Sequence, residues 1–416
     1  LAPASHDSVD SIPPMPTGGN LDDKRIGKGT TMYYPVEVAG GLLSMGDAHA
    51  AQGDSELDGT GIETSITGTF KITVLKAAEF SKPWMPLLDF PLGETADTYI
   101  IHGFTETDYL ETYATNPGDI YGASSIDKAM HNAYTQTRKF TMAAYGLTEA
   151  EANTIITQGV DFGMTQLVDG NWGVHAVVPK AIFDTDGVRR ALTESGKQAK
   201  KRKARKLQAA DLPLSAETVH WGYFSKLETP KLTIASGEIV TVEMASHHAC
   251  DDYDKMIKGD PGMESVFEWS TSTKAVSRRG ASGGGDGVHV LTGPIYVEGA
   301  EPGDILAVEV LDLAPRKNPE GKTFGSNAAA WWGFQARSDK VDGTPFTSGD
   351  FSGHDTNDEV VTIYELLEED GMHYATLSYQ FKWPTITDPE GVERNYIAYP
   401  GTCVPHDYVR CDQIEL

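Results

Sequence analysis

Eleven consecutive residues, Gly46–Glu56 (GDAHAAQGDSE), hold three carboxylates and one imidazole. The apolar side chains among them are all alanines, and the two glycines allow tight turns that can crowd polar groups together. A segment with only a packing role would avoid this composition, because burying polar groups without partners is costly. The segment therefore predicts a hydrolytic or metal-binding site that uses Asp47, His49, Asp54 and Glu56.

A second polar cluster, Ser246-His247-His248-Ala249-Cys250-Asp251-Asp252, directly follows a predicted strand. If a helical turn begins there, His247 shares a face with Asp251, and His248 shares one with Asp252. Imidazole and carboxylate groups are the usual ligands of catalytic zinc, which keeps one coordination position for water. Such an ion lowers the pKa of that water toward about 7 and polarises a carbonyl oxygen. Two such clusters predict a metal site, although the sequence alone does not bring them together.

Other uses of these residues stay open at this point. His49 could be a hydrogen-bonded structural histidine, and Asp54, beside Gly53, could be an ordinary turn residue. The acidic clusters could hold Ca²⁺ at a structural site of a non-catalytic binding module, but the histidines argue against this because Ca²⁺ takes oxygen ligands. Cys250 could pair with a histidine as a nucleophile, but no oxyanion-hole pattern accompanies it.

Charge and composition exclude several classes of partner. The 416-residue chain has 34 Lys and Arg against 60 Asp and Glu, for a formal net charge of −26. This charge argues against nucleic acid or an anionic membrane as a partner, and no run approaches the roughly 20 apolar residues of a membrane span. Three cysteines argue against a disulfide framework. We therefore expect a cytoplasmic protein that acts on a small neutral or cationic molecule.

The elements that position these side chains are predicted to be mainly strands. The chain has 43 glycines and 22 prolines, and its apolar runs are short and rich in β-branched residues. We expect strands at 30–38, 70–76, 174–178, 237–244, 305–313, 360–366 and 374–381. Apolar spacings of three and four predict a helix over 126–145, and a capping-box pattern at Thr148 and Glu151 predicts another over 148–158. The sequence predicts a mainly β fold with a small helical insertion around 126–160.

One basic segment interrupts this acidic chain. Seven of the ten residues from Lys197 to Lys206 are Lys or Arg. A run of like charge is typical of an exposed linker. We therefore place a boundary at 184–218, between a region at 1–183 and a region at 219–416.

Three segments resemble the acetamidase/formamidase family: Gly46–Glu56, which has the pattern GDxHAAQGDxE, Thr292–Asp304 and Gly18–Asp22. Weaker similarity covers 126–183 and 219–252. The resemblance implies a β-sandwich, jelly-roll-like fold and a cytoplasmic homo-oligomer that hydrolyses short aliphatic amides to the acid and ammonia. The segments His220–Tyr223 and Val288–Leu291 look closer to formamidases than to acetamidases.

The order of the segments departs from the family. In the family, the segment that resembles 219–313 lies near the amino terminus, and the segment that resembles 1–183 forms the carboxyl-terminal half. Here the order is reversed, so the chain looks circularly permuted, with the old termini joined near 184–218. Permutation is tolerated where termini lie close together at the surface.

From the residues and the resemblance together we predict a metal-dependent amidase. Its substrate is a short neutral amide, formamide first, with acetamide or a γ-lactam as the alternative. The predicted ligands of a divalent metal, most simply Zn²⁺, are Asp47, His49, His247 and Asp251. Glu56 is the predicted general base, and His248 a further ligand or oxyanion donor. Trp331, Trp332 and Asp54 are predicted to line the substrate pocket.

Overall fold

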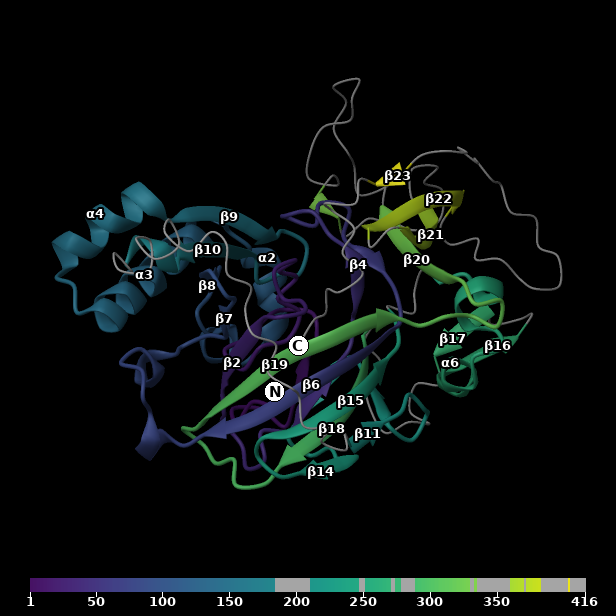
Figure 1. Cartoon of the computed structure of the whole chain (residues 1–416), viewed down its shortest axis with the longest axis horizontal. Helices are drawn as coiled ribbons and strands as arrows, with labels where there is room; N and C mark the ends of the chain where they lie inside the picture. The colour runs from purple at the N-terminus through teal and green to yellow at the C-terminus, as the bar shows by residue number, and fades with distance from the viewer. Residues whose placement is uncertain are drawn as a thin grey trace, which may run out of the picture.

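The computed structural model describes residues 1–183, 210–246, 251–270, 274–277, 289–329, 333–334, 360–369, 372–382 and 403–404. Strands predominate in these residues, and the two longest of the described helices lie together at the left of the view in Figure 1. The mainly β fold with a small helical insertion is therefore confirmed.

The largest sheet has nine strands in the order β11-β15-β6-β19-β2-β7-β8-β10-β9. Their bounds are β11 Ala210–Leu212, β15 Glu238–Met244, β6 Ile66–Leu75, β19 Ile305–Pro315, β2 Thr31–Pro35, β7 Leu92–Glu94, β8 Thr98–Phe104, β10 Gly173–Pro179 and β9 Asp161–Gln166. Along β6, buried and half-buried residues alternate, as expected for a strand with one face on a core. β6 and β19 run side by side across the middle of the molecule (Figure 1).

Two further sheets complete the main architecture. A four-stranded sheet contains β12 Val219–Trp221, β18 Val290–Val297, β14 Leu232–Ile234 and β3 Leu43–Met45. A six-stranded sheet contains β23 Cys403–Val404, β22 Met372–Lys382, β21 Val360–Glu369, β20 Thr323–Ala329, β5 Ile62–Glu63 and β4 His49–Ala51. Two-stranded pairs join β1 Ser8–Asp10 to β13 Tyr223–Ser225 and β16 Phe267–Ser270 to β17 Lys274–Ser277.

The largest core lies between the nine-stranded and four-stranded sheets. Phe70 of β6 and Leu306 of β19 pack in one cluster with Ile295 of β18 and Leu43 of β3, and none of these side chains is accessible to solvent. Burial of this apolar surface is the main source of stability in such a sandwich. The sandwich fixes the positions of the loop that follows β3 and of the residue that precedes β18, which carry part of the site described below.

The helical part packs on β8 and β10. Helix α3 (Ile126–Tyr145) begins after Ser125, whose side chain accepts a hydrogen bond from the amide of Lys128. Helix α4 (Glu149–Gly159) begins with the predicted capping box of Thr148 and Glu151. A Cβ atom on Gly103 of β8 would lie 2.0 Å from the amide nitrogen of Ala133 in α3, so the close contact between strand and helix requires glycine there.

Shorter helical segments connect these elements. They are the α-helices α1 Tyr109–Thr112, α2 Ile120–Ala123 and α6 Pro261–Val266, the π-helical turn Tyr253–Ile257, and the 3-10 turns Ala77–Glu79, Met85–Leu87, Pro117–Asp119 and Lys180–Ile182. Among the described residues, no helix has the length and apolar character to cross a membrane.

The two predicted regions contribute neighbouring strands to one sheet. β6 belongs to the region at 1–183, and its two neighbours, β15 and β19, belong to the region at 219–416. The basic run at 197–206 lies outside the described residues. The division into regions and the permuted segment order stay predictions.

Candidate active site and metal centre

Six buried titratable side chains gather where loops from several elements meet: Asp22, Asp47, His49, Glu56, Glu63 and Asp169. They form three overlapping groups in which one ligand atom from each residue lies within 4.8 Å of the others. The groups are Asp22–Asp47–His49, His49–Glu56–Glu63 and Asp22–Glu56–Asp169. Five carboxyl groups around one imidazole are too many to bury together without protons or a cation between them.

Strand pairing brings His49 against Glu63. β4 and β5 are antiparallel neighbours with His49 opposite Glu63, and directly opposed residues have side chains on one face of the sheet. The Nε2 atom of His49 lies 3.1 Å from Oε1 of Glu63 and 3.7 Å from Oδ2 of Asp47. A Cβ atom on Gly61 would lie 2.8 Å from Nδ1 of His49, so the imidazole fits only because this position has no side chain.

Gln52 fixes the orientation and tautomer of His49. Its Nε2 donates a hydrogen bond of 2.6 Å to the carbonyl oxygen of Asp22, which leaves its Oε1 facing Nδ1 of His49 at 3.0 Å. Because an amide oxygen only accepts, Nδ1 must carry the proton. Nε2 therefore faces the carboxylates, and in the described part of the chain none of them accepts a well-aligned hydrogen bond from it. This geometry suits a cation held between nitrogen and oxygens.

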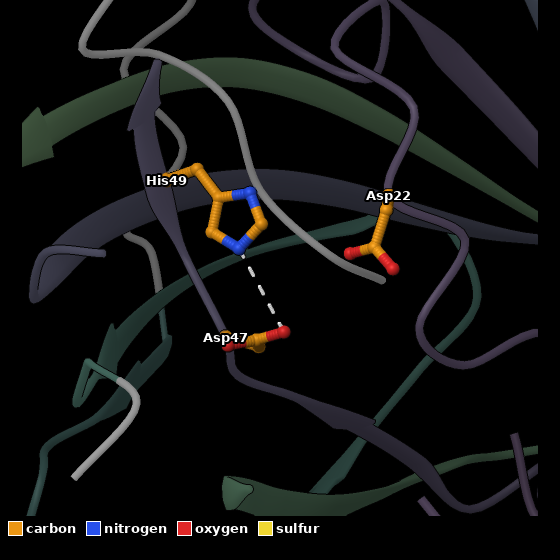
Figure 2. Close-up of side chains that lie close together, drawn as sticks. All are labelled: Asp22, Asp47 and His49. Carbon is orange, nitrogen blue, oxygen red and sulfur yellow. Dashed lines mark ion pairs between the residues drawn. The ribbon is translucent and has the colours of Figure 1, made fainter. Parts of the chain in front are cut away.

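Figure 2 shows how three of these side chains meet. Asp47 and His49 come from one segment and Asp22 from another, and all three point toward a common space. Asp22, Asp47 and Glu56 have φ angles of 50°, 50° and 47°. Residues other than glycine rarely adopt this left-handed conformation, and such strain concentrates at functional sites.

The loop that carries Glu56 is fixed to the end of β9. The amide of Ser55 donates to the carbonyl of Thr165, and the amide of Leu167 donates to the carbonyl of Ser55. The side chain of Gln166 then accepts hydrogen bonds of 3.1 Å from the amides of Val168 and Asp169. These bonds place Asp169 beside Glu56, although more than a hundred residues separate them in sequence.

Burial shifts the pKa of four of the clustered carboxyl groups upward. Burial raises the pKa of Asp22, and for Glu56 and Asp169 the neighbouring carboxylates add to the rise. Burial also raises the pKa of Glu63 to about 8, although His49 acts in the opposite direction. Burial opposes a charge on His49, but Glu63 and Asp47 raise its pKa well above its usual value. Without a metal, the cluster therefore retains protons near neutral pH.

These shifts predict that the metal-free protein loses stability as the pH rises. Glu63 titrates at about 8 in the folded chain and near 4.3 in an unfolded one, so the folded state holds the extra proton between these values. Its stabilising contribution is complete below about pH 4 and is lost as the pH rises through 8. We expect the free energy of unfolding in urea, with chelator present, to fall by roughly 2–5 kcal/mol between pH 5.5 and pH 8.

Substitution of the buried carboxyl group should flatten this dependence. Glu63→Gln should have a smaller slope, whereas Glu79→Gln, at an exposed site, should keep the wild-type slope. Equal stability of the metal-free wild-type protein at the two pH values would contradict the proton-retaining cluster.

A small pocket opens onto the Asp47 side of the cluster. Ser11, Asn20, Asp47, Phe224, His289 and Leu291 are among the residues that line its empty volume of about 240 Å³, which includes the opening to solvent. This is below the range of roughly 300–1,000 Å³ for pockets that bind drug-sized ligands. Nε2 of His289 lies 3.5 Å from Oδ2 of Asp47, and Nδ1 of His289 lies 2.7 Å from Oγ of Ser11. The pocket suits a very small polar molecule.

Arg25 links the two loops that carry Asp22 and Glu56. Its guanidinium binds Asp23 at 2.9 Å and both carboxylate oxygens of Asp54 at 3.0 Å. Burial alone would raise the pKa of Asp23, but the hydrogen bond with His102 and nearby positive charges hold it well below its usual value. Asp23 is thus a fully buried carboxylate that depends on these partners.

Loss of this guanidinium should destabilise the fold. Arg25→Met leaves the buried Asp23 charge without one of its partners, so we expect a cost on the order of 3 kcal/mol in the free energy of unfolding. Arg138→Met removes a more exposed ion pair with Glu149 and should cost less than about 1 kcal/mol. Urea unfolding of the two variants compares them directly, and equal costs would contradict a special role for Arg25.

The structure places the predicted site residues as follows. Asp47, His49 and Glu56 lie together in the buried cluster. Asp54 pairs with Arg25 and Lys24. Asp251 is buried, with its carboxylate accepting hydrogen bonds from Ser246 and from Ser326, and it precedes the π-helical turn. Of the remaining predicted residues, His247, His248, Trp331 and Trp332 lie outside the described residues.

Sequence reasoning missed four residues of this region: Asp22, Glu63, Asp169 and His289. Asp22 and His289 stand in segments that carry the family resemblance, but spacing along the chain does not place them beside Asp47. Glu63 ends a short strand, and its only local signal is the preceding Gly61. Asp169 follows a strand and precedes Gly170, which reads as an ordinary turn.

Comparison with known protein families finds a match over most of the chain. The model of the Acetamidase/Formamidase family matches residues 1–185 and 286–379, which is more than half of the chain. The chain belongs to the acetamidase/formamidase family. The matched residues include all six members of the buried cluster and His289.

Individual relatives in the acetamidase/formamidase family match short stretches. A formamidase of Methylophilus methylotrophus is 46% identical over 54 residues, which is 13% of each chain. An acetamidase of Mycolicibacterium smegmatis is 41% identical over 58 residues, which is 14% of each chain. The matched stretches thus span about an eighth of the length of these curated relatives. The crystal structure of an acetamidase from Bacillus halodurans is 22% identical, with a TM-score of 0.32, over 45% of this chain and 54% of that chain.

Proposed function

We propose that this protein hydrolyses a short aliphatic amide, formamide in the first place, to the carboxylic acid and ammonia, with the aid of a divalent metal at the buried cluster. The observation that carries the proposal is the position of His49 Nε2 among the carboxylates of Asp47 and Glu63. Membership of a family named for amidases supports the reaction class.

The donor set fits a zinc-like ion. One imidazole nitrogen with carboxylate oxygens is a common ligand set of catalytic zinc. His49 supplies Nε2, held in position by Gln52, and Asp47 supplies an oxygen. Asp22 offers a further oxygen in the group with Asp47 and His49, and Glu63 offers one in the group with His49 and Glu56. A Zn²⁺ ion bound here would polarise the amide carbonyl and lower the pKa of water.

Glu56 is the residue proposed to move the proton. It is buried in a group with His49 and Glu63, and its pKa is raised well above the usual value by burial and by nearby carboxylates. A carboxylate whose pKa is raised is a stronger base, and it is suited to take a proton from water and pass it to the leaving nitrogen. The small pocket beside Asp47 and His289 would hold the amide.

The remaining predictions belong to the same proposal. His247 and Asp251 are proposed as further ligands and His248 as a ligand or oxyanion donor, since Ser326, which binds Asp251, lies opposite Glu63 on the paired strand. Trp331 and Trp332 are proposed to line the substrate pocket. We also propose that the protein works in the cytoplasm as a homo-oligomer.

Ammonia release from formamide, acetamide and propionamide by the purified zinc-loaded protein tests the reaction. We expect turnover of formamide to exceed that of acetamide, and that of acetamide to exceed that of propionamide, because the pocket is small. One methylene group changes kcat/KM by about 10- to 200-fold in a fitted apolar pocket. A preference for acetamide would overturn the choice of formamide, and no ammonia from any of the three would overturn the proposed reaction.

A further inference from the structure

We propose that the cluster binds a second cation, a hard divalent ion such as Mg²⁺ or Ca²⁺, between Asp22, Glu56 and Asp169. These three residues form a group with ligand atoms within 4.8 Å of one another, and all three are at least nine-tenths buried. This inference concerns binding, and it does not depend on the amide reaction.

The second centre is distinct from the one at His49. An imidazole nitrogen binds a single ion, and Nδ1 of His49 is occupied by its hydrogen bond to Gln52. The two groups that contain His49 therefore describe one centre around Nε2. Asp169 belongs to neither of them, and its own group contains no nitrogen. Asp22 can serve both centres because each carboxylate has two oxygens. For the same reason Glu56 can bind the second ion through one oxygen and move the proton with the other.

Unpartnered oxygens point into this second centre. In the described part of the chain, both carboxylate oxygens of Asp22 and Oδ2 of Asp169 are buried and accept no hydrogen bond from a donor. Nor does any Lys or Arg of the described ranges form an ion pair with Asp22, Glu56 or Asp169. Buried carboxylates of this kind are normally paired or bind a metal. A bound cation would supply the positive partner that these carboxylates need.

The chemistry of the donors selects the class of ion. Three carboxylate oxygens without nitrogen or sulfur suit Mg²⁺ and Ca²⁺, which prefer oxygen ligands and complete their shells with water. The loops already hold the carboxylates in place. The Asp22 carbonyl is bound by Gln52, and the Asp169 amide is bound by Gln166. The left-handed φ angles of Asp22 and Glu56 add backbone strain at the same place, as is common at functional sites.

Equilibrium dialysis of the zinc-loaded protein against Ca²⁺ or Mg²⁺ tests the second centre. The buffer contains salt at about 0.15 M to screen surface carboxylates, and elemental analysis gives both metals per chain. We expect one tightly bound Ca²⁺ or Mg²⁺ in addition to zinc. Asp169→Asn should lose this ion and keep the zinc. Asp161→Asn, which removes an exposed carboxylate at the start of β9, should bind like the wild type.

Other results would overturn the second centre. Zinc-loaded wild-type protein that binds no Ca²⁺ or Mg²⁺ would show that Asp22 and Asp169 share a proton instead of a cation. This result would overturn the second centre even if the D169N variant did not fold. A folded D169N variant that binds the ion as tightly as the wild type would also overturn the assignment. Failure of the proposed reaction looks different, because a chain that binds both ions and releases no ammonia would contradict only the amidase proposal.

Discussion

His49→Ala should abolish ammonia release from formamide and remove the zinc-like ion from the protein. His49 supplies the nitrogen donor of the cluster, and its Nε2 faces the Glu63 and Asp47 carboxylates at 3.1 Å and 3.7 Å. Without it, the described residues of the cluster offer only oxygens, and the first centre loses the nitrogen donor that favours zinc. The measurement pairs the rate of ammonia release with the zinc content of each purified protein.

His131→Ala is the matched control for this substitution. His131 lies on α3 and is exposed, so its removal should change neither the zinc content nor the rate. Circular dichroism of the His49 variant should match that of the wild type, which separates loss of metal from loss of fold. A folded His49→Ala protein with wild-type activity would contradict the placement of the active site at this cluster.

Glu56→Gln should lower kcat for formamide by about 10²- to 10⁴-fold, the usual contribution of a positioned general base. The amide keeps the shape of the side chain but cannot carry the proton from water to the leaving nitrogen. Glu56 is not the nitrogen donor of the first centre, so we expect zinc content to stay near the wild-type value. Steady-state kinetics and metal analysis on the same sample give both quantities.

Substitution of an exposed glutamate is the control for Glu56→Gln. Glu298→Gln, at an exposed position, should leave kcat unchanged. If Glu56→Gln lost zinc and activity in equal proportion, Glu56 would act as a ligand of the first centre rather than as its general base. If it kept full activity, the assigned proton transfer would be wrong.

Much of the fold could be predicted because local patterns carry it. The strands predicted at 70–76 and 305–313 correspond to β6 and β19 of the structure. The capping box at Thr148 starts α4 where the sequence places it. Each of these features depends on residues within a few positions of one another, so a local sequence pattern is enough to predict it.

The sequence predicted only those site residues that stand close together along the chain. Asp47, His49 and Glu56 stand within ten residues, and their crowding was a sufficient signal. Glu63 joins them through the β4–β5 pairing, and Asp169 joins them through the contact between Ser55 and the end of β9. Such long-range pairings depend on the whole sandwich, so no local pattern reports them.

Asp54 shows that closeness in sequence can also include a residue that does not belong to the buried cluster. It belongs to the crowded segment, yet the structure pairs it with Arg25, which stands close to Asp22 in the sequence. Sequence crowding therefore identified the segment but did not distinguish a residue that faces the cluster from one that ties the loop down.

The most direct test of the central claim is ammonia release from formamide before and after complete removal of metal. The protein is stripped with chelator, its metal content is checked by elemental analysis, and Zn²⁺ is then returned. The buried arrangement of His49 with Asp47 and Glu63 predicts that activity falls to the assay background and returns with zinc. Full ammonia release from protein shown to be free of metal would contradict it.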